Sequence, residues 1–438
     1  MPRGPMKAIR TALAKAFDFG RDRRGSTAVL FAVSMPMLIG SLGVGFEISN
    51  WYVIKRGMQN AADAAVLAAA SNGGANFDVE AKAVTSQFGL THGVAGVGVT
   101  VLNNVACPGG GSTCYSVTIS NSVPLYLSPV VGFAGSGGGK QNLVATSIAK
   151  IGTIQRPYCL LALGSGGTQT DLIANGAPKA NFAGCSVKSN SSARCNGHDL
   201  GADFGDAVGT STGCGKVQTS GVPPSIDPYA GLAANIPADN CGGSYPQIPS
   251  ASVVTWFGIK NLSGNVMICG DLKLTGNVSV NAPSGAVLVI QNGRLDTNGY
   301  RLETTPGSGL TIVFTGTVGG SYIHAPTGGG TIDVAAPTSG VWSGVMMYQD
   351  PKLTTGVDIT EAGSSPTWNI TGLVYLPNSN ITLSGAINKS ANGGNCFVVV
   401  ADTIVINGAA DISPKGGCAA AGLTMPTGAV PGRGALVY

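Results

Sequence analysis

One serine of this sequence lies at the centre of a G-x-S-x-G pattern, Gly209-Thr210-Ser211-Thr212-Gly213. In hydrolases this pattern holds the nucleophile at a strained turn between an apolar strand and a helix. Here Gly205-Asp206-Ala207-Val208 precedes it and Cys214-Gly215-Lys216 follows it, so neither flanking element is predicted. In a chain rich in Gly, Ser and Thr such a match arises easily, so we do not expect Ser211 to be a nucleophile.

The three histidines, His92, His198 and His324, lie in three separate regions of the chain. A Ser-His-Asp site would have to combine Ser211 with His198, and no second pattern supports that combination. We therefore expect the histidines to be surface or turn residues. The prediction is a protein that is not an enzyme, with no catalytic, cofactor-binding or metal-binding residue and no cofactor.

Metal and phosphate sites are also not predicted. The carboxylates of the C-terminal half are dispersed and form no Asp-x-Asp pair of the kind that clusters around calcium: Asp271, Asp296, Asp333, Asp350 and Asp358. The glycine-rich residues 137–141 resemble a phosphate loop, but Ala134 replaces its first glycine and Gln141 replaces its Ser/Thr. We expect a flexible loop there.

All ten cysteines lie in the part of the chain after residue 106: Cys107, Cys114, Cys159, Cys185, Cys195, Cys214, Cys241, Cys269, Cys396 and Cys418. An even number without a CxxC pair indicates disulfides in an oxidising compartment. We expect Cys107 to pair with Cys114 across a glycine-rich turn. Cys185, Cys195 and Cys214 are expected to pair among themselves, or with Cys159 or Cys241.

The element that must position everything else is an apolar stretch near the N-terminus. Arg21, Arg23 and Arg24 precede it, and no charged residue occurs from Ser26 to Phe46. About 20 residues at 1.5 Å each cross a hydrocarbon core of about 30 Å. The alanine-rich sequence that follows predicts one helix continuing to Ser71, so we interpret the stretch as a retained anchor. The basic residues before it place the N-terminus in the cytoplasm.

A family resemblance rests on the same stretch. RRG, an apolar span, a nearby acidic residue and Gln59-Asn60-Ala61-Ala62-Asp63-Ala64-Ala65 together resemble TadG-like Flp pilus-assembly proteins of tight-adherence (Tad) systems. The segments SVTISNSVPLYLSPVVGF and VATSIAKI, and later GCSVKSNS and IDPY, are similar to further patterns of this family. The resemblance implies a role in pilus assembly and adherence.

Two features found in relatives or in pilins are not matched. Some members carry a metal-binding Asp-x-Ser-x-Ser motif, but the nearest match, residues 411–415, has Lys415 in place of the last serine. Pilin precursors are cut after a glycine that is followed, five residues on, by glutamate. The fifth residue after Gly25 is Leu30, which favours a permanent anchor over a cleaved pilin.

The remaining chain predicts an α+β protein that is mainly β. We expect a cytoplasmic tail (1–25), a transmembrane helix (26–48), a pilin-like helix with a small sheet (49–155), a Cys-rich connector (156–250) and a β-solenoid (251–438). The last assignment rests on apolar runs that recur at 286–290, 310–314, 345–348, 373–376 and 397–400. A β-sandwich is the alternative fold for that region.

Composition narrows the function classes. Charged residues make up 11% of the chain, and the net charge of +4 comes mainly from the N-terminal tail, so no nucleic-acid partner is expected. We predict a single-pass protein of the bacterial inner membrane with a periplasmic or surface body. It would act as an accessory scaffold that contacts lipid and, through its long helix, pilus-assembly components or pilin-like proteins. The alternatives are a surface adhesin that binds glycans through the solenoid and, less favoured, an anchored carbohydrate-active enzyme.

The long helix also carries a candidate interaction surface. A stripe of small residues, Ala61, Ala62, Ala65, Ala68 and Ala69, would allow close packing against a neighbouring helix. That neighbour is either a pilin-like helix or the protein's own residues 75–155, and the sequence favours neither.

Overall fold

The structure, a computed structural model, forms two compact units. Unit 1 contains residues up to Thr153 together with Pro431–Tyr438, and unit 2 is Ile154–Val430. The structure describes residues 26–72, 76–108, 110, 113–164, 169–176, 179–180, 182–318, 322–359, 367–384, 396–407, 411–412 and 417–437.

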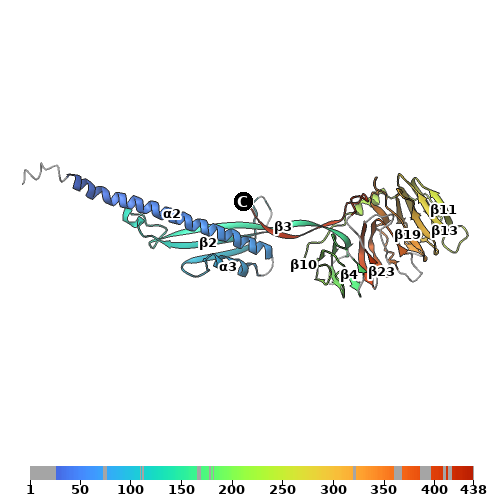
Figure 1. The fold of residues 1–438 in the computed structure, drawn as a ribbon, viewed down its shortest axis with the longest axis horizontal. Helices are drawn as coiled ribbons and strands as arrows, with labels where there is room; N and C mark the ends of the chain where they lie inside the picture. The colour runs from blue at the N-terminus through green and yellow to red at the C-terminus, as the bar shows by residue number, and fades with distance from the viewer. Residues whose placement is uncertain are drawn as a thin grey trace, which may run out of the picture. The chain divides into compact units, whose positions relative to one another are not determined.

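Unit 1 is a long helix, α2 (Ser26–Asn72), packed on a short helix and an antiparallel sheet (Figure 1). The shorter helix is α3 (Phe77–Gln87), and the strands are β1 (Val97–Val105), β2 (Cys114–Pro124) and the first part of β3 (Lys140–Ala162). The C-terminal end of the chain joins this unit, since Val437 N–H donates to the carbonyl of Ile148. The predicted helix that continues to Ser71 is confirmed.

Unit 2 is a solenoid of short, mostly parallel strands. Its elements are the end of β3, then β4 (Thr170–Asn175), β5 (Lys179–Ala180), β6 (Ser186–Ser189), β7 (Ser192–Cys195), β8 (Phe204–Ala207), β9 (Ser211–Thr212), β10 (Val217–Ser220), the 3-10 turn η3 (Ala230–Asn235), β11 (Val254–Asn261), β12 (Gly264–Cys269), β13 (Leu272–Asn281), β14 (Ala286–Gln291), β15 (Leu295–Asp296), β16 (Arg301–Thr304), β17 (Leu310–Thr315), β18 (Pro326–Thr327), β19 (Thr331–Asp333), β20 (Val345–Gln349), β21 (Val357–Ile359), β22 (Thr367–Trp368), β23 (Gly372–Ser384), β24 (Phe397–Asn407), β25 (Asp411–Ile412) and the start of β26 (Thr427–Leu436).

The predicted solenoid is confirmed by its ladders, which are parallel rather than the antiparallel pairing of a sandwich. One face runs in the order β10-β8-β6-β3-β24-β23-β20-β17-β14-β12. A second face runs β9-β7-β4-β24-β23-β21, and a third is built on β11 and β13. All five apolar runs named from the sequence are strands of the first face.

The order of the first face shows how the chain winds. The first coils lead away from β3 as far as β10, and residues 221–253 then connect to β11 and β12 at the opposite end of the ladder. From there the coils return until β24 pairs with both β3 and β4. The sequence assigns residues 156–250 to a Cys-rich connector, but residues 156–220 of that segment form coils of the same solenoid. The non-solenoid connection is 221–253.

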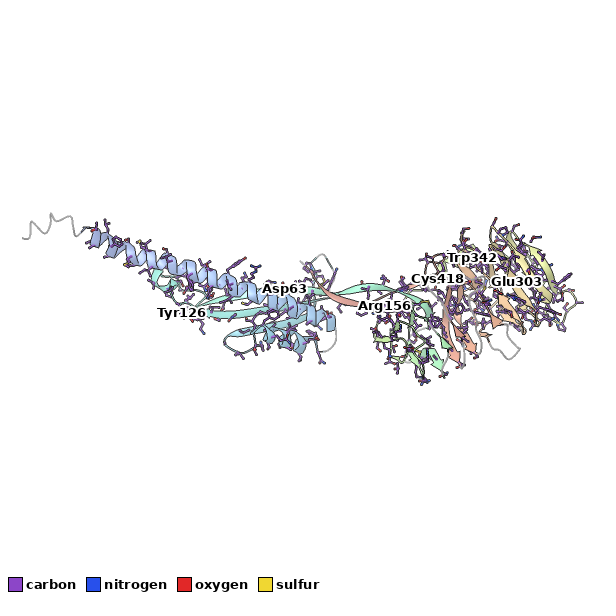
Figure 2. All side chains as sticks on the ribbon, viewed as in Figure 1. Asp63, Tyr126, Arg156, Glu303, Trp342 and Cys418 are labelled. Atoms are coloured by element: carbon purple, nitrogen blue, oxygen red, sulfur yellow. A yellow bond between two sulfur atoms is a disulfide. The ribbon has the colours of Figure 1, made fainter. Side chains whose placement is uncertain are left out.

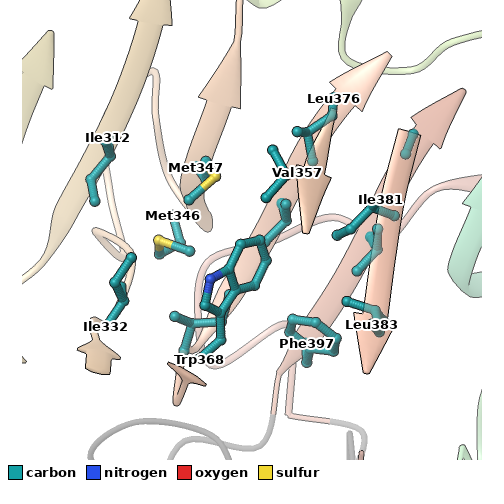
Figure 3. Packing of buried hydrophobic residues seen from close by; sticks show 14 of the residues in the cluster. Ile312, Ile332, Met346, Met347, Val357, Trp368, Leu376, Ile381, Leu383 and Phe397 are labelled. Atoms are coloured by element: carbon teal, nitrogen blue, oxygen red, sulfur yellow. The ribbon is translucent and has the colours of Figure 1, made fainter. Parts of the chain in front are cut away.

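The inside of the solenoid is filled by aliphatic and aromatic side chains. Trp368 is fully buried, and Figure 3 shows its indole among Met346, Ile332 and Phe397, which come from different coils. The outer side of the first face is also covered, by Tyr229 and its neighbours, so strands such as β14 are buried along their whole length. This two-sided burial is why the runs are continuously apolar instead of alternating.

Five disulfides connect residues that are near in sequence, and the ten cysteines leave none free: Cys107–Cys114, Cys159–Cys185, Cys195–Cys214, Cys241–Cys269 and Cys396–Cys418. The prediction for Cys107 is confirmed. Among the alternatives left open by the sequence, Cys185 pairs with Cys159, and Cys195 pairs with Cys214.

Candidate functional site

The first part of α2 is an apolar rod. Every residue from 27 to 39 is exposed, including Phe31 and Met37, although the segment has a mean hydropathy high enough to cross a membrane. Pro36 lies inside the helix and does not interrupt it. Large apolar side chains exposed on all sides of a helix indicate a lipid or protein environment. This half of α2 is the membrane-anchoring element.

A buried stripe begins at Gly40 and follows one face of α2. Gly40, Gly43 and Glu47 are buried at the spacing i, i+3, i+7, which keeps them on one side of the helix. A Cβ atom on Gly40 would lie 2.0 Å from Val131 Cγ1, and one on Gly43 would lie 2.6 Å from Leu127 Cβ. The two glycines are therefore the places where the β2–β3 loop reaches the helix backbone.

The same loop binds the one acidic side chain of this stretch. The carboxylate of Glu47 accepts hydrogen bonds from the backbone N–H groups of Tyr126, Leu127 and Ser128, at 2.5, 2.6 and 3.2 Å. Figure 2 shows Tyr126 beside α2, at the end of the sheet. Trp51 continues the contact, with its ring centroid 5.8 Å from that of Phe133. Glu47 is thus 3% exposed and fully engaged by protein groups.

The alanine stripe lies further along α2 and is occupied by the protein's own sheet. Ala61, Ala62, Ala65 and Ala69 have no exposed surface, and their cluster contains Val117 and Ile119 of β2. Ala68 is half-buried. Of the two outcomes left open by the sequence, packing on residues 75–155 is the one observed. The alternative, packing of this stripe on a pilin-like helix, is wrong for Ala61, Ala62, Ala65 and Ala69, because the sheet already covers them.

Comparison with known proteins gives one finding on this helix. The family model for Tad, described as Flp pilus-assembly TadE/G-like, matches residues 25–72. We call α2, the helix that this family model matches, the Tad segment. The match confirms the resemblance over this helix, and its bounds differ from those of α2 by one residue at the N-terminal end. No curated protein and no solved structure gives a significant match to the chain.

The Tad segment thus combines two halves with different surroundings. Its first half exposes apolar side chains and anchors the protein, while its second half is fixed to the sheet of unit 1. Involvement in Flp pilus assembly follows from this family match.

Ser211 and His198, the catalytic candidates from the sequence, lie in unit 2 and form hydrogen bonds with the backbone. Ser211 is in β9, and its hydroxyl donates to the carbonyl of Gly205 at 2.9 Å. His198 accepts a hydrogen bond at Nδ1 from Leu200 N–H. Among the described residues, no hydrogen bond joins Ser211 to His198. The strand that contains Ser211 leads into a turn and not into a helix.

The dispersed aspartates also have structural partners. Asp271 is buried and accepts from Ile248 N–H and from the backbone and guanidinium of Arg294. Asp350 accepts from Thr315 Oγ1 and pairs with Lys352. In the part of the chain that the structure describes, no three His, Cys, Asp or Glu side chains gather as metal ligands would. Residues 413–415 of the Asp-x-Ser-like sequence lie outside the described residues.

One buried polar cluster was not found from the sequence. Asp206 is fully buried between Arg156, 2.7 Å away, and the hydroxyl of Tyr158, 2.8 Å away. Lys188, its parallel-strand neighbour, donates to the carbonyl of Pro223 at 2.6 Å. Burial lowers the pKa of Lys188 to about 8, an effect that the Asp206 charge partly offsets. In the sequence, the only sign of this cluster is that charged residues occur inside short strands. That sign does not show which of them contact one another.

The solenoid has shallow hollows at one row of turns. They are lined by Ser284, Gly285, Pro337 and Ser339, with Trp342 at one side. No charged side chain is among the described residues that line them. Hydroxyl, amide and backbone groups there could form hydrogen bonds to a polar ligand.

Proposed function

We propose that this protein is a membrane-anchored, non-catalytic scaffold of Flp pilus assembly, held in the inner membrane by α2 with its N-terminus in the cytoplasm. The observation that carries the proposal is that the Tad match covers one helix, whose apolar first half is free and whose second half is fixed to a folded body. Such a helix sets the position of that body relative to the membrane.

The chemistry of unit 2 supports a structural role. The polar side chains considered as catalytic or metal-binding residues, such as Ser211 and Asp271, form hydrogen bonds within the solenoid. Five disulfides favour folding in an oxidising compartment, which agrees with a body outside the cytoplasm. The basic residues before the helix favour the same orientation.

The partner surface in this proposal is the exposed apolar half of α2. Phe31, Leu38 and Leu42 are free to contact either lipid or the apolar helix of a pilin-like protein within the bilayer. A photo-crosslinking residue at Leu42 should capture pilus-assembly components in intact cells. The same residue at Val79, which is equally apolar and exposed but lies on α3, is the matched control.

The deciding experiment is the intact mass of the mature protein, measured separately from membranes and from sheared surface filaments. An uncleaved chain confined to membranes is the expected result for an anchored assembly factor. A chain that begins at Ser26 and is found in filaments would instead make it a minor pilus subunit and would overturn the scaffold proposal.

A further inference from the structure

The β2–β3 loop, residues 125–133, lies beside a part of α2 that the sequence assigns to the bilayer. Leu127 faces Gly43, Val131 faces Gly40, and the loop's N–H groups reach Glu47. All three helix positions are at or before the end of the predicted transmembrane segment. Either the loop lies in the bilayer beside these helix residues, or these residues lie in water and the transmembrane span is shorter than predicted.

Length decides between these possibilities. If the loop lay wholly in water, only residues 27–39 of α2 would remain free to span, a length of about 20 Å. A hydrocarbon core is about 30 Å thick. The missing length is supplied by residues 40–46, which carry no charge and expose Leu42 and Phe46 on the faces that the loop leaves free. A full span thus places the loop at bilayer depth.

The loop has the composition for that position. Residues 125–133, LYLSPVVGF, contain no charged side chain. Tyr126 is 73% exposed and Val130 is 63% exposed, and Val131 is also exposed. Apolar side chains directed outward from a loop, next to an apolar helix, continue the lipid-facing surface of that helix.

The N–H groups of the loop backbone have partners within the protein. Irregular backbone is tolerated at membrane depth only where its polar groups are satisfied by protein. Leu125 N–H donates to the carbonyl of Gly139, and the N–H groups of residues 126–128 donate to Glu47. Pro129 has no N–H, and those of Val130, Gly132 and Phe133 donate to carbonyls within the loop.

This arrangement also accounts for an acidic residue at the end of the apolar span. A carboxylate near lipid is costly unless it is hydrogen-bonded. Glu47 obtains three donors from the loop, and the loop obtains an acceptor for the N–H groups of residues 126–128, which lead into a 3-10 turn at Ser128–Val131. Each side supplies what the other would lack in a bilayer.

We propose that residues 125–133 are a second membrane contact of this protein, inserted beside α2 with Val130 and Val131 in the hydrocarbon and Tyr126 at its boundary. Val131 lies beside Gly40, which is seven residues before Glu47. At 1.5 Å per residue, Val131 is therefore about 10 Å deeper in the bilayer than the boundary at Glu47. The aromatic pair of Trp51 and Phe133 lies near that boundary, where such side chains are enriched. The inference rests on the anchoring part of the proposed function.

The experiment uses the full chain reconstituted in phospholipid vesicles with one introduced thiol. Three single variants, V33C, V79C and V130C, replace valines that are 64%, 68% and 63% exposed and lie on the first half of α2, on α3 and in the loop. Because the native cysteines are all in disulfides, the introduced one is the only thiol to carry an environment-sensitive fluorophore. Quenchers are a nitroxide on the lipid chains and iodide in the water.

The expected result is strong lipid-borne quenching at residues 33 and 130, several-fold above that at residue 79, which iodide alone should quench. If residue 33 is quenched from the lipid while residue 130 behaves like residue 79, the loop inference is wrong and the anchor stands. Shielding of residue 130 from both quenchers would show a protein cover and would also overturn the inference. Absence of lipid quenching at residue 33 would remove the anchor and the inference together.

Discussion

The hydroxyl of Tyr375 donates a hydrogen bond to Asp227 Oδ2 at 2.6 Å. Tyr375 is on β23 of the solenoid, whereas Asp227 is in the connection between β10 and β11. Asp227 also accepts from Tyr229 N–H through its other oxygen, and the rings of Tyr348 and Tyr375 stack at 4.6 Å. The connection is thus held on the outer side of the first face by a tyrosine cluster.

Removing this hydroxyl should loosen the connection. We predict that Tyr375→Phe lowers the free energy of unfolding by about 1–3 kcal/mol, because Asp227 Oδ2 loses its hydrogen-bond donor. Denaturant unfolding followed by tryptophan fluorescence measures the change. Tyr300→Phe is the matched control, at a partly exposed tyrosine of the same unit, and should change stability by less than about 0.5 kcal/mol. Equal effects at both positions would contradict the assigned bond.

The outer cover also explains which parts of the solenoid could be predicted. Runs such as residues 286–290 and 397–400 are apolar at every position because both of their sides are buried, so they stand out in the sequence. The span at 26–46 could be predicted because it is a long run without charge. The bridge Cys107–Cys114 could be predicted because its two cysteines are only seven residues apart.

The coils in residues 154–220 could not be recognised. Their strands are two to six residues long after β3, and inward positions are filled by small residues such as Ala193 and Ala207 between disulfides. Glu47 was visible as an acidic residue, but its partners are backbone N–H groups about 80 residues away, which no side-chain pattern encodes. The ion pair between Asp206 and Arg156 could not be predicted either, because its two residues lie in different coils, 50 residues apart in the sequence.

Lys188 should make the stability of unit 2 depend on pH. Its pKa is lowered from 10.5 to about 8 by burial, so between pH 8 and 10 the unfolded chain holds a proton that the folded protein has released. Stability from this group therefore rises as pH increases through that interval. We predict that Lys188→Met removes this rise in melting temperature, measured from pH 7 to 10. Lys216→Met, at a largely exposed lysine, should retain it, and parallel curves for Lys188→Met and wild type would refute the prediction.

Above this interval the buried tyrosines should reverse the trend. Burial raises the pKa of Tyr158, Tyr229, Tyr348 and Tyr375, with the charges of Asp206 or Asp227 adding to the effect. A folded-state pKa above the unfolded value of about 10 means that their stabilising contribution is lost as the pH rises beyond it. The absorbance of ionised tyrosine should therefore increase only on unfolding for this group. Full ionisation in the folded protein near pH 10 would contradict their burial.

Ser211 offers a direct check on the non-catalytic proposal. Its hydroxyl donates to Gly205 at the edge of the solenoid, so Ser211→Ala should cost about 1 kcal/mol or less in stability. Pilus assembly in cells should be unchanged. A variant that folds, shown by an unaltered melting curve within that margin, but abolishes assembly would assign Ser211 a chemical role and count against a scaffold.

The contact between α2 and the loop can be tested with two glycines two residues apart. Gly43→Ala places a Cβ 2.6 Å from Leu127 Cβ, so the loop must move away from the helix. We predict faster hydrogen–deuterium exchange at the N–H groups of residues 126–128, measured on the full chain in detergent, because Glu47 can no longer accept from them. Gly45→Ala has no heavy atom within 4 Å of its new Cβ, so it should leave that exchange unchanged and favour the helix by about 1 kcal/mol. Unchanged exchange in both variants would mean that the loop is not held by Glu47 on this face of α2.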